Sequence, residues 1–156
     1  MIGAFPDAMV EQVAVDALED QMPNDEKDRH VLAAAVAAGA DLIVTNNVRH
    51  FLPTDLERVG KRSITPDGLL CELLRSAPSI VRESLELQAA HMRTPRTWTV
   101  AELLGLLGGL GHGDAQAPEF AASAANAFGI EPAPPPRPSS TTDSAGRHQP
   151  NAPSQR

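Results

Sequence analysis

Two aspartates, Asp25 and Asp28, open an alanine-rich stretch of the chain, and their spacing could support metal chemistry. In a helix, residues three apart share one face, and the free N–H groups at a helix start favour anions. Mg²⁺ prefers oxygen ligands and commonly takes one or two carboxylates from a protein. The pair could therefore hold a metal ion, although the local sequence by itself favours the structural alternative. The alternative is an ordinary helix cap at Asp25 beside a solvated Asp28.

A second polar group follows residues 42–44, an apolar run that predicts a strand buried on both faces. Thr45, Asn46 and Asn47 come directly after this run. Sites in open parallel sheets lie beyond the carboxyl ends of the strands. A hydroxyl and two amides at that place could position a metal-bound water or a substrate phosphate. The alternative is that the asparagines only form the turn.

Basic side chains lie close to both groups in the sequence. Arg29 and Arg49 could each hold an RNA phosphate through two parallel hydrogen bonds. His30 and His50 are not at metal-ligand spacing, so we expect them to be structural or exposed. Cys71 lies within a leucine-rich stripe and is expected to be a core residue instead of a nucleophile.

Capping residues and apolar periodicity predict the elements that would position these side chains. In the first part of the chain we expect helices within residues 1–22 and over residues 25–38, 53–59 and 67–75, with strands at 42–44 and 62–65. Further helices are expected over residues 80–92, 99–107 and 118–127. The fold class is thus α/β over residues 1–76, followed by a helical extension over 77–129. Residues 130–156 are rich in proline and serine, and we predict a disordered tail there.

An apolar stripe begins in the expected helix over residues 99–107 and extends past its end, and it is interrupted by glycines: Leu103, Leu106, Leu107 and Leu110. Packing against the α/β part is the favoured explanation of this stripe. A groove for a partner helix is the alternative.

Composition excludes several classes of protein. A formal net charge of −7 argues against a protein that coats nucleic acid, which would need an excess of Lys and Arg. The single cysteine excludes a disulfide scaffold and favours a reducing compartment. No apolar run approaches the ~20 residues that span a bilayer, and the N-terminus has no signal-peptide pattern. We therefore expect a cytoplasmic protein without a membrane segment.

Two motifs in combination carry a resemblance to a known family. The pattern D-x-x-D-R-H-V-L-A-A-A begins at Asp25, and G-A-D-L-I-V-T-N-N-x-x-x-F begins at Gly39. Residues 25–75 are similar to the second half of PIN domains, in the bacterial branch that includes the toxins of VapC-type toxin–antitoxin pairs. Residues 78–107 also resemble the helical C-terminal extension of one such toxin subfamily.

This resemblance implies an α/β/α sandwich with parallel strands and a metal-dependent endoribonuclease that cleaves single-stranded RNA with Mg²⁺ or Mn²⁺. By position, Asp25 and Asp28 would be metal ligands and catalytic acids. Asn47 would be a third catalytic residue, since it falls where many members carry a further Asp. Its amide brings no charge, which should weaken metal binding. Thr45, Arg29 and Arg49 would contact the substrate. The implied partners are the RNA, a cognate antitoxin and a second copy of the chain in a homodimer.

The chain also departs from the family pattern. PIN domains begin with a buried strand ending in Asp and place a Glu some tens of residues later, and neither has a counterpart before Asn24. The sequence therefore predicts an N-terminally truncated PIN domain and leaves its enzymatic activity open. The alternatives are a non-catalytic remnant whose helices bind a partner such as the antitoxin, and a helical adaptor outside the family.

Overall fold

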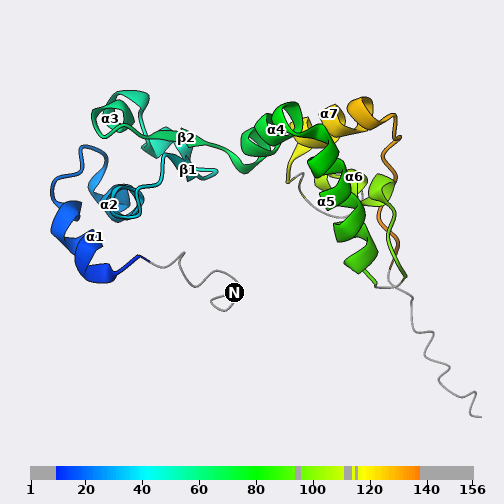
Figure 1. Cartoon of the computed structure of the whole chain (residues 1–156), viewed down its shortest axis with the longest axis horizontal. Coiled ribbons are helices and arrows are strands. Elements are labelled where there is room, and N and C mark those ends of the chain that lie inside the picture. Colours follow the sequence, from blue (N-terminus) through cyan, green and yellow to red (C-terminus); the bar gives the residue numbers. More distant parts are fainter. Residues whose placement is uncertain (1–9, 94–95, 111–113, 115, 138–156) are drawn as a thin grey trace, which may run out of the picture.

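The chain forms a mixed α/β structure in which a small parallel sheet is followed by a group of helices (Figure 1). The computed structural model describes residues 10–93, 96–110, 114 and 116–137. The elements up to β2 gather at one end of the molecule, and α4 to α7 form the other end (Figure 1). The prediction of an α/β fold class is confirmed.

Most of the predicted elements are present with bounds within a few residues of those expected. The first half contains α1 (Gln12–Glu19), η2 (Glu26–Asp28), α2 (Arg29–Ala37), β1 (Leu42–Val44), η3 (Val48–His50), α3 (Pro53–Arg58) and β2 (Arg62–Ile64), where η2 and η3 are 3₁₀ turns. The second half contains α4 (Pro66–Ser76), α5 (Pro78–His91), α6 (Val100–Leu107) and α7 (Pro118–Phe128). The part of the first expected helix that covers residues 1–9 lies outside the described residues.

The two strands are parallel, and α3 lies in the connection between them. Leu42 pairs with Arg62 and Val44 with Ile64. Parallel pairing needs such a crossover because the chain must return to the same end of the sheet. The prediction that the first strand is buried on both faces is wrong, since only Ile43 is buried and Val44 is 45% exposed. In a sheet of two strands, few elements are available to cover the second face.

One hydrophobic cluster holds the α/β part together. Its buried members come from α1, α2, β1, α3 and the intervening turns: Val15, Met22, Leu32, Ala33, Ile43, Phe51 and Leu56. Two glycines set the turns that let these elements fold back on each other. Gly39 follows α2 with φ 64° and Gly60 follows α3 with φ 66°, a backbone region that favours glycine.

A second cluster joins the helices from α4 onward. Its buried members are Leu74, Leu85, Ala89, Leu103, Leu104, Ala117, Phe120 and Ala124. Thr65 caps α4 by accepting a hydrogen bond from the Gly68 N–H at 3.0 Å, with Pro66 at the first helical position. Because α4 contributes Leu74 to this cluster, it packs with the helices that follow it. The division predicted after residue 76 stays a prediction.

The first turn of α7 receives its cap from a distant part of the chain. Asp67, in the first turn of α4, accepts hydrogen bonds from the backbone N–H groups of Glu119 at 3.0 Å and Phe120 at 2.8 Å. The local N-cap residue, Ala117, has no side chain that could do this. The contact fixes α7 against α4 through a charge-assisted pair of hydrogen bonds.

Helix α6 begins with the capping box that the sequence predicts at Thr99 and Glu102. The expectation that its leucines pack against the α/β part is wrong. Leu103 and Leu104 are buried within the helical cluster, because α6 lies against α5 and α7. Leu104, which the periodic stripe omitted, is the fully buried one, at 0% exposure.

The chain after α7 runs back along α6. Residues 131–137 have no helix or strand, and the Ala133 N–H donates to the Ala101 carbonyl at 2.9 Å. A Cβ on Gly105 would lie 1.8 Å from the Ala133 carbonyl oxygen, so only glycine allows this approach. Most of the predicted tail, residues 138–156, lies outside the described residues. No helix among the described residues is long and apolar enough to cross a bilayer.

Candidate functional site

The central feature of the candidate site is a contact between the start of α2 and the turn that follows β1. The Asp28 carboxylate oxygen Oδ2 lies 2.7 Å from Nδ1 of His50. The two residues are 22 positions apart in the sequence. The contact joins the N-terminus of α2 to the turn at the carboxyl end of β1. Asp28 lies at a helix start as the sequence predicts, whereas the sequence gives no indication that His50 is its partner.

Asp25 is exposed and acts as a local cap. Its Oδ1 accepts a hydrogen bond from the Lys27 N–H at 3.0 Å at the start of η2. This is the alternative that the sequence left open, and it occupies one of the two carboxylate oxygens. Arg29 is partly buried, and its Nε donates to the Asn24 carbonyl at 3.3 Å. Its two terminal nitrogens remain available for another acceptor.

The turn after β1 is held by its own polar side chains. Thr45 Oγ1 accepts from the Asn47 N–H at 3.0 Å, and Asn47 Oδ1 accepts from Arg49 Nε at 3.2 Å. Both contacts join residues two apart, so the asparagine does help to form the turn. His50 follows in the same turn, which places it beside these residues at the end of β1. Asn46 is exposed.

A buried amide that the sequence does not mark as functional lies beside the acidic turn. Asn24 is 3% exposed, and neither side-chain atom of its amide has a hydrogen-bond partner. Leaving such a group unpaired costs about 1–3 kcal/mol. The only sequence signal was its place before Asp25, where it resembles a second cap residue.

The donor set for a metal ion is of the right type but incomplete. Carboxylate oxygens of Asp25 and Asp28 and the amide oxygen of Asn47 are ligands that Mg²⁺ accepts. Each of these side chains already has a partner, however. Among the described residues, no three His, Cys, Asp or Glu side chains lie together in a way that could hold a metal ion. These residues alone therefore do not complete a metal centre.

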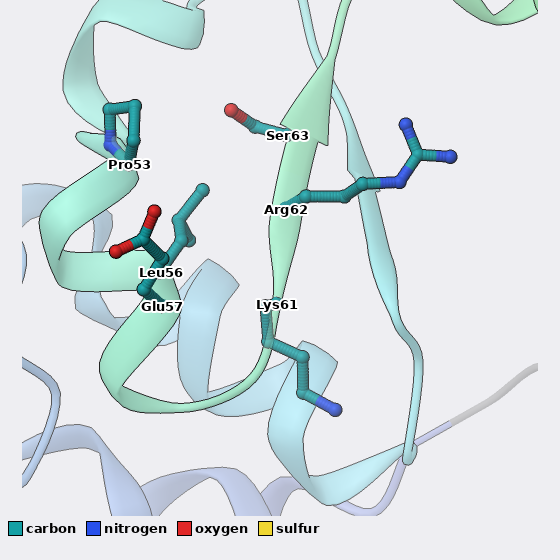
Figure 2. Close-up of a pocket in the computed structure, with 6 residues that line it drawn as sticks. All are labelled: Pro53, Leu56, Glu57, Lys61, Arg62 and Ser63. Atoms are coloured by element: carbon teal, nitrogen blue, oxygen red, sulfur yellow. The ribbon is translucent and has the colours of Figure 1, made fainter.

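A small pocket of 140 Å³ lies between α3 and β2, and none of the predicted site residues lines it (Figure 2). Its lining includes Glu57, Lys61 and Arg62. Figure 2 shows the Arg62 guanidinium on the opposite side of β2 from Pro53. There it makes two hydrogen bonds with Glu72, at 3.0 and 2.9 Å. The charged groups do not converge in this pocket, so it is not the candidate site.

The fold and the polar turn define a mixed α/β protein with an acid–histidine contact at the carboxyl end of a parallel strand. The chain is 36% identical over 108 residues to a protein of Mycobacterium tuberculosis (strain ATCC 25618 / H37Rv) named "Putative ribonuclease VapC50". The match covers 69% of this chain and 59% of the relative, so the chain spans less than two thirds of that relative's length. This similarity supports a relation of the chain to VapC-type PIN domain proteins. No family model matches it, and no solved structure does.

Proposed function

We propose that the chain acts in the cleavage of single-stranded RNA as a VapC-type ribonuclease, with Asp28 as the central acid of its site. The observation that carries this proposal is the Asp28–His50 contact at the carboxyl end of β1. It brings an acid predicted from the family pattern to the edge of the sheet where α/β proteins bind their substrates. The sheet and its helices would be the C-terminal half of an α/β/α sandwich.

The basic side chains near this edge are suited to hold the RNA backbone. Arg49 is exposed and uses only its Nε within the turn, which leaves two nitrogens for a phosphate. Arg29 offers a second guanidinium from the start of α2. Thr45 and Asn47 would fix the shape of the turn against which a phosphate lies. Because the chain carries a net charge of −7, these cations must act locally.

The family relation also supports Mg²⁺ or Mn²⁺ as a cofactor, with Asp25 and Asp28 as ligands. Since the described residues bring too few ligands together, we expect weak binding. Titration calorimetry with Mn²⁺ on the full chain and on Asp28→Asn tests this assignment. Binding by the parent chain that is lost in Asp28→Asn supports it, and equal heats from both contradict it.

The ribonuclease activity itself is tested with a fluorescently labelled single-stranded RNA and Mn²⁺. We expect the full chain to cleave it and Asp28→Asn to lose the cleavage. The matched control is Asp20→Asn, which changes an exposed acid after α1 and should cleave like the parent. No cleavage by the parent, or equal cleavage by Asp28→Asn, would overturn the proposal.

A second candidate function rests on an apolar groove in the helical part. The groove has a cavity volume of 480 Å³ between α4, α5, α6 and α7. Ile80 is 63% and Leu73 is 44% exposed at its rim, an unusual position for large apolar side chains. Such a groove suits an apolar helix of a cognate antitoxin. If the chain neither cleaves RNA nor binds Mn²⁺, this partner-binding function is favoured. The homodimer remains a prediction from the family resemblance.

A further inference from the structure

We propose that His50 is a positioning residue that orients the Asp28 carboxylate for the reaction. This inference rests on the proposed ribonuclease function and adds a residue to its site. His50 belongs to η3 and Asp28 to the start of α2, so the contact ties together two elements that the sequence separates by 22 positions.

The orientation of Asp28 is not set by its own helix. An aspartate at an N-cap ordinarily accepts a hydrogen bond from a backbone N–H in the first turn. Asp28 is the N-cap of α2, yet its side chain makes no such bond. Its backbone, at φ −111° and ψ 4°, also differs from the extended conformation usual for a cap. The hydrogen bond to His50 is therefore what fixes the direction of the carboxylate.

His50 is itself placed by a well-anchored turn. Its backbone N–H donates to the Asn47 carbonyl at 3.1 Å, and the next residue, Phe51, is 3% exposed in the first hydrophobic cluster. The side chain of Asn47 is held in turn by Arg49. Because the core and the turn fix the backbone of His50, its imidazole has a defined position from which it can orient the Asp28 carboxylate.

The contact also defines which nitrogen carries the proton. An ionised carboxylate only accepts hydrogen bonds, so Nδ1 of His50 must donate to Oδ2 of Asp28. In the neutral ring, Nε2 is then an acceptor directed away from Asp28. The side chain of His50 is 39% exposed and that of Asp28 is 20% exposed, which leaves the pair accessible to a substrate at its edge.

The orientation can be tested without any activity measurement. At a pH where the imidazole is neutral, ¹⁵N NMR of the parent chain should show the Nδ1–H tautomer for His50. In Asp28→Ala the ring should revert to the Nε2–H tautomer, since the acceptor that selects the other form is gone. The exposed His30 of α2 serves as the internal control and should keep one tautomer in both proteins. An Nε2–H tautomer in the parent would overturn the inference.

The role in the reaction is tested by RNA cleavage with three substitutions. His50→Asn keeps an N–H donor close to the position of Nδ1, whereas His50→Gln places its amide farther out and His50→Ala has no donor. We expect His50→Ala and His50→Gln to lose about 10- to 100-fold in kcat with little change in KM, and His50→Asn to recover most of the loss. Thermal unfolding of each variant identifies any loss that comes from misfolding.

The outcomes separate this inference from the function on which it rests. If the parent chain cleaves RNA and all three variants match it, His50 has no positioning role. Equal losses in His50→Ala and His50→Asn also overturn the inference, because the donor would not matter. If the parent does not cleave RNA, the proposed function fails, and the NMR result still reports whether His50 holds Asp28.

Discussion

At the scale of single residues, the most strongly held carboxylate among those described lies outside the candidate site. Glu102 is 7% exposed and accepts hydrogen bonds from the Arg96 guanidinium and from the Thr99 N–H at 2.9 Å. The hydrogen bond from Arg96, followed by that from the Thr99 backbone, lowers the pKa of Glu102 from 4.5 to about 2. The folded state therefore stabilises the ionised form of the Glu102 carboxylate.

This shift predicts how Glu102 contributes to stability as the pH falls. Because the folded pKa lies below the unfolded one, the stabilisation is complete above about pH 4.5 and is lost as the pH falls toward 2. Glu102→Gln should therefore be less stable than the parent at pH 6, and the two should converge near pH 2. Urea unfolding of both proteins at several pH values measures the difference. A gap that stays constant with pH would contradict the assignment.

Whether the sequence predicts the hydrogen-bond partner of a side chain depends on how near that partner lies in the sequence. The capping box of Thr99 and Glu102 was predictable because its members lie three positions apart. The partners of Asp28 and Asp67, by contrast, lie 22 to 53 positions away, and only the folded chain brings them together. For this reason His50 was expected to be structural or exposed, although it contacts Asp28, the central acid of the proposed site.

At the scale of elements, the close approach of residues 131–137 to α6 depends on one glycine. A side chain at position 105 would collide with the Ala133 backbone at 1.8 Å, and backbone cannot yield as a flexible side chain does. Gly105→Ala should therefore displace this segment and break the hydrogen bond from Ala133 to Ala101. Hydrogen exchange should show loss of protection at the Ala133 amide.

The control for this prediction is Gly108→Ala. A Cβ on Gly108 would meet its nearest neighbour, the Leu104 carbonyl oxygen, at 3.3 Å, a distance that a small shift relieves. Protection of the Ala133 amide should survive this change. If Gly105→Ala leaves that amide protected as well, the segment does not depend on the close approach to α6.

Elements with signals in their own sequence were predicted well. Gly39 and Gly60 follow the ends of helices, and Thr65 with Pro66 begins one, so these signals lie within a few residues of the elements they delimit. The faces that elements present to each other were predicted less well. Val44 is exposed although it belongs to an apolar run, because its burial depends on which other elements cover the strand, and the strand sequence does not contain that information.

At the scale of the whole molecule, the two hydrophobic clusters share no residue. The first is built from elements up to α3, and the second from α4 onward. Leu56 is 2% exposed in the first cluster, and Leu104 is 0% exposed in the second. Each of these leucines belongs to only one cluster. A cavity made in one cluster should therefore leave the packing of the other cluster intact.

Truncation of these two leucines tests the separation. Leu104→Ala should destabilise the helical cluster by about 2–5 kcal/mol and lower the protection of amides in α6 and α7, while amides in α2 and β1 keep theirs. Leu56→Ala should produce the reverse pattern. Hydrogen exchange read by mass spectrometry on both variants is the measurement. An equal loss of amide protection throughout the chain in either variant would mean that the two clusters unfold as one unit.

The cap that Asp67 provides for α7 also has a consequence for the order in which the helices form. Helix α7 has 11 residues, and isolated helices shorter than ~12–15 residues are marginal in water. Its cap comes from a residue 52 positions upstream of Glu119, so the chain between them must close before α7 gains this stabilisation. We therefore expect α4 to form first during refolding and α7 to form late. Helix α7 should become stable only when the N–H groups of its first turn reach the Asp67 carboxylate.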